Sequence, residues 1–121
     1  MNLYCDGSVS PRGSRWIVVD ENKKVLMDIS TADKKTCNEC EYLAMIEALS
    51  QAKDGDTIFT DSKLVEGQLT RQWAINYEHL KKLHDWAYHI LQGKQLVKIQ
   101  WIRREDNKAG QFLEEELRSK N

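Results

Sequence analysis

The chain has 121 residues, of which 40% are hydrophobic and 31% are charged, with a formal net charge of −1. This length predicts one domain spanning residues 1–121, with a hydrophobic core of its own. The near-neutral charge excludes a large field of one sign, so a nucleic-acid partner can be argued only from local basic residues. No run of about 18 apolar residues occurs, and a membrane-spanning helix is therefore not expected.

The start of the sequence and its cysteine content both bear on where the protein works. The first residues, MNLYCDG, lack the basic and apolar regions of a secretory signal segment. Three cysteines are an odd number and form no disulfide framework. We therefore expect a reducing, cytoplasmic compartment.

Three strands are predicted near the N-terminus, at residues 2–6, 16–19 and 25–30, because β-branched and aromatic residues are concentrated there. Residues 20–23 are turn-forming and join the last two strands as a hairpin. Further along the chain, helical and strand patterns alternate. We expect helices at 38–53, 62–66, 77–92 and from Asn107 or Asp106 to about 118, and strands at 57–60 and 96–101.

This order of elements predicts an α/β fold. A hairpin followed by alternating helices and strands gives a five-stranded mixed sheet in the order β-β-β-α-β-α-β-α when the brief helix at 62–66 is left out, with helices on both faces. The strands at 2–6, 57–60 and 96–101 should be parallel, because helical crossovers connect them. Ligands of such sheets bind at the carboxyl ends of the parallel strands.

Three separated acidic residues stand at the expected ends of elements. Asp6 and Asp61 each follow a short apolar strand pattern, and Glu41 lies near the start of the helix at 38–53. Carboxylates that converge repel one another unless a cation neutralises them. The pattern therefore predicts a divalent-metal site, although each acid alone would be read equally well as a solvated charge.

The segments around these acids resemble the ribonuclease H family, and the resemblance covers essentially the whole chain in order. It is closest to compact members that lack the extra basic helix of larger relatives. The matching segments are Asp6-Gly7-Ser8, residues 38–44, Thr60-Asp61-Ser62, Trp73 with residues 78–83, and residues 101–107.

The resemblance implies an endonuclease that hydrolyses the RNA strand of RNA/DNA hybrids and acts as a monomer without an obligate protein partner or a membrane. Asp6, Glu41 and Asp61 would be the catalytic residues and would bind two Mg²⁺ ions, or Mn²⁺ in their place. Asn38 matches the position that contacts the RNA strand, where an amide can address a 2′-hydroxyl; its alternative is a helix cap. Ser8 and Ser62 would touch phosphates, or cap backbone groups.

Two departures from the family pattern concern the last helix and the loop before it. The family usually has a fourth acid four residues after the final asparagine, and here that position is Gln111. Glu115, one turn further on, could replace it, but a solvated charge is the favoured interpretation. The loop at 102–106 also lacks the family's histidine, and we read Arg104 there as a substrate contact, with a surface ion pair as the alternative.

Two other functions are compatible with parts of the sequence. Gln111 and the missing histidine favour a catalytically weakened module that binds hybrids without cleaving them. Another nuclease of the same fold, such as a resolvase or transposase, is disfavoured by the small size and by the segment containing Asn38. Cys37-x-x-Cys40 lacks a second ligand pair for zinc and a thioredoxin-like setting, so we read these cysteines as small buried residues.

Overall fold

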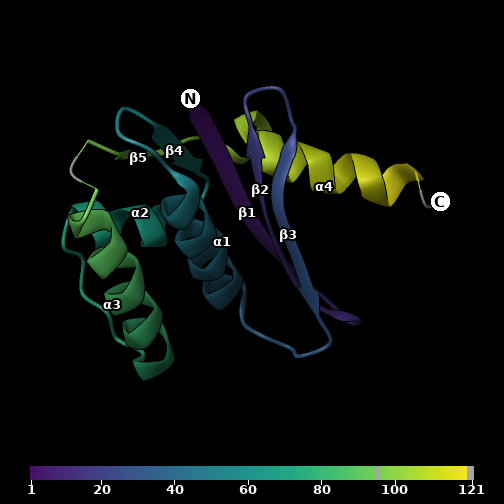
Figure 1. Ribbon diagram of the computed structural model, residues 1–121. Coiled ribbons are helices and arrows are strands. Elements are labelled where there is room, and N and C mark those ends of the chain that lie inside the picture. The colour runs from purple at the N-terminus through teal and green to yellow at the C-terminus, as the bar shows by residue number, and fades with distance from the viewer. Residues whose placement is uncertain (95, 120–121) are drawn as a thin grey trace.

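The computed structural model describes residues 1–94 and 96–119. Five strands form one mixed sheet in the order β3-β2-β1-β4-β5 (Figure 1). In chain order the elements are β1 (Asn2–Ser10), β2 (Gly13–Asp20), β3 (Val25–Thr31), α1 (Cys37–Gln51), β4 (Thr57–Thr60), α2 (Lys63–Thr70), α3 (Glu78–Gln92), β5 (Lys98–Trp101), the short 3₁₀ helix η1 (Arg104–Asp106) and α4 (Lys108–Ser119). The predicted fold class and order of elements are confirmed.

The strands β1 and β2 are longer than the sequence predicted. They pair antiparallel from Leu3 opposite Asp20 to Ser10 opposite Gly13, so only a two-residue turn separates them. Gly7, Ser8 and Ser10, which follow Asp6, are weak β-formers, and it is the pairing with β2 that holds them extended. Gly13 has φ +135, and a Cβ there would lie 2.0 Å from the Thr31 carbonyl oxygen, so this end of the hairpin requires glycine.

The strands β1, β4 and β5 are parallel, as predicted, but the pairing of β1 with β4 is short. β1 pairs with β4 only from Asn2 to Tyr4, whereas β4 pairs with β5 from Thr57 to Thr60. Beyond Tyr4, therefore, β1 and β4 separate. Asp6 lies in the middle of β1 rather than at its end, but it is just past the carboxyl end of the parallel pairing.

Several helix and strand boundaries differ from the prediction. α1 begins at Cys37, because Thr36 and Glu39 form a capping box in which each side chain accepts a backbone N–H of the other residue. α2 is longer than expected and extends to Thr70. The fifth strand is shorter and begins at Lys98.

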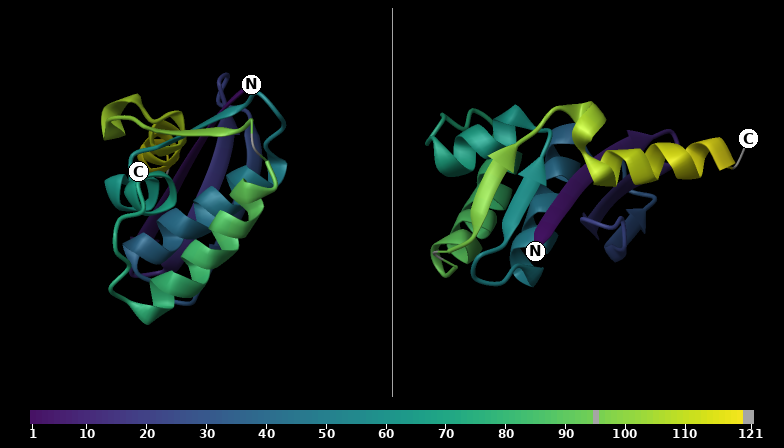
Figure 2. Two further views of the ribbon diagram at one scale, coloured as in Figure 1. Left: turned by 90° about the vertical axis from the view of Figure 1, so that its left-hand side faces the viewer. Right: turned by 90° about the horizontal axis from the view of Figure 1, so that it is seen from above.

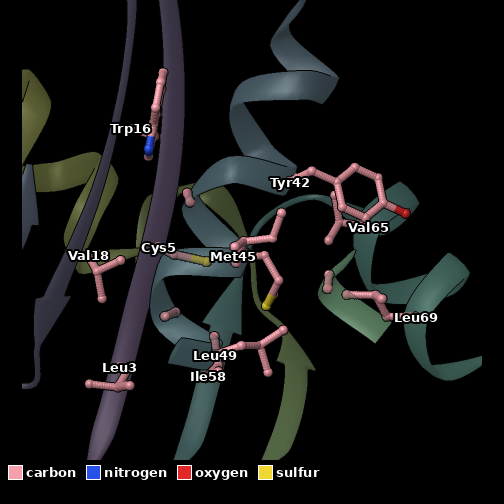
Figure 3. Close-up of a cluster of buried hydrophobic side chains, with 14 of the residues drawn as sticks. Leu3, Cys5, Trp16, Val18, Tyr42, Met45, Leu49, Ile58, Val65 and Leu69 are labelled. Atoms are coloured by element: carbon pink, nitrogen blue, oxygen red, sulfur yellow. The ribbon is translucent and has the colours of Figure 1, made fainter. Parts of the chain in front are cut away.

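Helices cover both faces of the sheet (Figures 1 and 2). Trp16 and Val18 of β2 belong to the larger core with α1, α2 and α3, while Ile17 and Val19, which point to the other face, pack with Ala109 and Leu113 of α4. Figure 3 displays the larger core, with sheet and helix side chains directed toward one another. Among the described residues, no helix has both the length and the apolar character needed to span a membrane.

Candidate active site

Three carboxylates meet at the point where β1 and β4 separate. Asp6 comes from β1, Asp61 directly follows β4, and Glu41 lies in the second turn of α1. One carboxylate oxygen from each lies within 4.8 Å of the others. The structure thus brings together the three acids that the sequence singled out.

The backbone of Gly7 holds two of these carboxylates. Its N–H donates to Asp6 Oδ1 and to Glu41 Oε1, each at 3.0 Å. A Cβ on Gly7 would lie 2.5 Å from the carbonyl carbon of Cys40, because α1 crosses β1 here at backbone distance. Glycine at this position therefore allows α1 to carry Glu41 against Asp6.

The carboxylate cluster is nearly buried and costs free energy when it is fully charged. Asp6 is 9% exposed and Glu41 8%. Burial raises the pKa of Glu41 well above its usual range, and a hydrogen bond with Asp6 and the charges of Asp6 and Asp61 raise it further. Burial also raises the pKa of Asp6, and the charge of Asp61 adds to the effect.

The donor set fits a hard divalent cation. Glu41 Oε2 is buried and has no hydrogen-bond partner within the described part of the chain. A cation between the carboxylates would satisfy this oxygen and remove their mutual repulsion, and Mg²⁺ prefers carboxylate oxygens to nitrogen or sulfur.

Asp61 is oriented by two residues that sequence reasoning did not assign to the site. Asn107 Nδ2 donates to Asp61 Oδ2 and to the Cys5 carbonyl oxygen, each at 3.0 Å. Trp101 Nε1 donates to the Asp61 backbone carbonyl oxygen at 3.1 Å. Asn107 also accepts the Ala109 N–H through Oδ1, as predicted for a helix cap. The available signal is the segment 101–107, in which Trp101 is part of the match to the family and Asn107 is predicted as a helix cap.

A groove of about 540 Å³ opens beside Asp6. Ser8 and Arg104, both predicted to contact substrate, line it. Ser62 lies next to Asp61 and caps α2 by accepting the Val65 N–H at 3.2 Å. Asn38 is exposed in the first turn of α1; because Thr36 is the cap, the alternative interpretation of Asn38 as a cap is wrong.

The two residues considered for a fourth acid make contacts away from the cluster. Gln111 Nε2 donates to the Glu105 carbonyl oxygen at 2.8 Å, and Glu115 pairs with Lys23 at 2.9 Å. The residue of α4 that meets the cluster is Gly110, where a Cβ would lie 3.1 Å from Asp6 Oδ2. One turn later, Glu114 lines the groove.

Comparisons with known proteins agree with this architecture. Residues 4–113 match the family model described as Reverse transcriptase-like. Ribonuclease HI of Halobacterium salinarum is 30% identical over 115 residues, which cover 91% of this chain and 58% of that relative. The chain thus spans less than two thirds of the length of this curated relative.

Solved structures have the same fold. RNase H1 from the halophilic archaeon Halobacterium salinarum NRC-1 has a TM-score of 0.74 at 26% identity, covering 98% of this chain and 97% of that one. LC11-RNase H1, solved in complex with an RNA/DNA hybrid, has a TM-score of 0.67 at 22% identity, covering 88% and 87% of the two chains. From the match over residues 4–113 and this shared fold, we conclude that the chain belongs to the reverse transcriptase-like family of ribonuclease H-type domains.

Proposed function

We propose that this chain is a metal-dependent endonuclease that hydrolyses the RNA strand of RNA/DNA hybrids. The observation that carries the proposal is the convergence of Asp6, Glu41 and Asp61, whose oxygens lie within 4.8 Å of one another. An RNA/DNA hybrid is the substrate class we infer, since a structure of the same fold, LC11-RNase H1, was solved with such a hybrid.

The three carboxylates are the proposed ligands of two Mg²⁺ ions, or of Mn²⁺ in their place. When bound, two such ions activate a water and stabilise the leaving oxygen of a phosphodiester. The protein's own part is orientation: the Gly7 N–H fixes Asp6 and Glu41, and Asn107 fixes Asp61. Preorganised ligands of this kind lose little entropy when metal and substrate bind.

The groove beside Asp6 supplies the proposed substrate contacts. Arg104 is exposed on its wall and suits a phosphate oxygen, and Ser8 offers a hydroxyl there. Asn38 is exposed on the first turn of α1, three residues before Glu41, where its amide can address a 2′-hydroxyl and distinguish RNA from DNA. Ser62, already engaged as the α2 cap, is the weakest of the predicted contacts.

The proposed setting is a monomer acting in the cytoplasm. All three cysteines are free, and Cys5 and Cys40 are buried as thiols, as suits a reducing compartment. We further propose that residues 1–121 act as one domain.

The test is cleavage of a labelled RNA/DNA hybrid with Mg²⁺ by the purified protein and by Asp6→Asn/Asp61→Asn. We expect the double variant to fold, as judged by circular dichroism, and to lose cleavage because its metal ligands have lost their charge. A matched control is Glu47→Gln/Asp54→Asn, which removes two acids outside the cluster and should cleave normally. Unchanged cleavage by Asp6→Asn/Asp61→Asn would refute the proposal.

A second candidate is a module that binds hybrids without cleaving them. It is favoured by the contacts of Gln111 and Glu115, which leave neither residue directed at the cluster. Multiple turnover on a hybrid with Mg²⁺ or Mn²⁺ would dismiss it. Competition among hybrid, double-stranded DNA and branched DNA separates both candidates from a nuclease of another specificity.

A further inference from the structure

The first turn of α1 carries a pair of cysteines that the proposed catalysis does not use. Cys37, the first residue of α1, is exposed and lines the same groove as Asp6 and Arg104. Its thiol is therefore open to small solutes at the wall of the substrate groove.

Cys40 lies one turn further along α1 and is fully buried. A Cβ on Gly7 would lie 2.6 Å from the Cβ of Cys40, so the two residues are in close contact. Cys40 also precedes Glu41 directly, and the Gly7 N–H binds both Asp6 and Glu41. Any displacement of Cys40 is consequently transmitted to two of the three carboxylates.

The spacing of the two cysteines places their thiols near each other. Residues three apart on a helix have Cβ atoms about 5–6 Å apart, and a disulfide requires about 3.5–4.5 Å. A Cys37–Cys40 disulfide therefore requires the first turn of α1 to tighten by about 1–2 Å.

We propose that Cys37 is a site of thiol modification by low-molecular-weight disulfides, and that Cys40 converts the adduct into an intramolecular disulfide that weakens metal binding at the carboxylate cluster. The consequence for hybrid cleavage rests on the function proposed above. The modification of Cys37 and its effect on metal affinity do not depend on that function.

The chemistry is two successive thiol–disulfide exchanges, with glutathione disulfide as the example. The Cys37 sulfur attacks one sulfur of glutathione disulfide, whose S–S bond breaks, and the first glutathione leaves with the Cys37 proton. The Cys40 sulfur then attacks the Cys37 sulfur, and the second glutathione leaves with the Cys40 proton. Overall, two cysteine thiols are oxidised to one disulfide, and one glutathione disulfide is reduced to two thiols.

The experiment treats the reduced, metal-free protein with glutathione disulfide and follows it by intact mass and peptide mapping. Mn²⁺ affinity is then measured by isothermal titration calorimetry, before and after treatment and again after dithiothreitol. We expect a transient adduct on Cys37, then a Cys37–Cys40 disulfide. We also expect Mn²⁺ affinity to fall about tenfold, which is the effect of displacing a group that orients a metal ligand. The affinity should recover when dithiothreitol reduces the disulfide.

Three variants make the outcome decisive. Cys37→Ser should form no adduct and keep its Mn²⁺ affinity under oxidation. Cys40→Ser should stop at the mixed disulfide, and Cys5→Ser should switch like the wild type. First modification at Cys5, or a Cys37–Cys40 disulfide without a change in Mn²⁺ affinity, would overturn the proposal. A protein that switches Mn²⁺ affinity but cleaves no hybrid would support this inference while refuting the proposed function.

Discussion

Asn107 links three parts of the molecule through one side chain, by its bonds to Asp61, the Cys5 carbonyl and the Ala109 N–H. Asn107→Ser keeps an oxygen that can cap α4 but removes the donor to Asp61 and Cys5. We expect a loss of about 1–3 kcal/mol of unfolding free energy, because the buried Cys5 carbonyl is left unpaired, and a drop of about tenfold in Mg²⁺ affinity.

Urea unfolding and calorimetric Mg²⁺ titration would measure these two effects of Asn107→Ser. Thr36→Ser is the matched control, because it also changes a helix cap conservatively, and it should stay within about 0.5 kcal/mol of wild type. Equal Mg²⁺ affinity in wild type and Asn107→Ser would contradict the role of Asn107 in positioning Asp61.

At the scale of elements, α4 approaches the cluster through a residue without a side chain. Gly110→Ala raises helix propensity by up to about 1 kcal/mol, yet its Cβ would lie 3.1 Å from Asp6 Oδ2 and press on a carboxylate that Gly7 already holds. We therefore expect stability within about 1 kcal/mol of wild type together with about tenfold weaker Mg²⁺ binding.

Thermal unfolding of the metal-free protein and Mg²⁺ titration would separate the two consequences of Gly110→Ala. Gln111→Ala, the next residue of α4, contacts the Glu105 carbonyl rather than the cluster and should leave Mg²⁺ affinity unchanged. If Gln111→Ala weakened Mg²⁺ binding as much as Gly110→Ala, the assignment of Gly110 as the point of contact would fail.

The elements that could be predicted are those with a local pattern. Periodicity and turn residues located the hairpin at residues 20–23 and the parallel strands. The extension of β1 to Ser10 could not be predicted, because its residues are extended only through their partners on β2. The length of α2 also depends on tertiary packing, since a Cβ on Gly67 would lie 2.2 Å from the Trp73 ring.

The same distinction applies to the site. Asp6, Glu41 and Asp61 were predictable because each follows a recognisable strand or opens a helix, and the topology then brings them together. The bond from Asn107 to the Cys5 carbonyl joins residues 102 positions apart, and no local pattern encodes it. The contacts of Gln111 and Glu115 likewise depend on where α4 lies across the sheet.

For the whole molecule, the raised carboxyl pKa values couple stability to pH and to metal. The pKa of Asp6 is raised to about 6, and that of Glu41 is higher still. The folded state therefore binds these protons more tightly than the unfolded chain, so the contribution of this pair is complete below about pH 4 and is lost as the pH rises through 6 and beyond. We expect the Tm of the metal-free protein to fall from about pH 5 to about pH 9.

Thermal unfolding with chelator and with saturating Mg²⁺ would test this coupling. Because metal binding displaces the same protons, the increase in Tm caused by Mg²⁺ should grow with pH. The pKa of Asp56 is lowered by hydrogen bonds and by the N-terminal ammonium despite its burial. Its contribution to stability is therefore lost in acid, whereas that of Asp6 and Glu41 is lost as the pH rises. An increase in Tm from Mg²⁺ that did not depend on pH would contradict the coupling.

Replacing the most strongly shifted carboxyl of the cluster should stabilise the metal-free protein. At pH 8 the unfolded chain has an ionised Glu41, and folding must either protonate it or bury its charge beside Asp6 and Asp61. Glu41→Gln avoids this cost because its amide is neutral in both states, and we expect a gain of about 1–3 kcal/mol at pH 8 without metal, with loss of the Mg²⁺ effect. Glu47→Gln is the control in the same helix, because Glu47 lies further along α1 and outside the carboxylate cluster. Urea unfolding of the metal-free wild type and both variants at pH 8 would measure this gain in unfolding free energy. A Glu41→Gln variant less stable than the wild type would contradict the expected gain.

The separation of β1 and β4 after Tyr4 divides the sheet into a fixed base and a projecting arm. The three carboxylates lie at this fork, the point where β1 and β4 separate, and Asn107 holds Asp61 there by a hydrogen bond. The arm, taken as residues Ser8–Ser10 of β1 with their partners Gly13–Arg15 of β2, contributes Ser8 to the groove wall but holds no member of the triad. The reach of the groove can therefore be changed by lengthening the turn at Pro11 and Arg12, while the metal-binding geometry at the fork stays as it is.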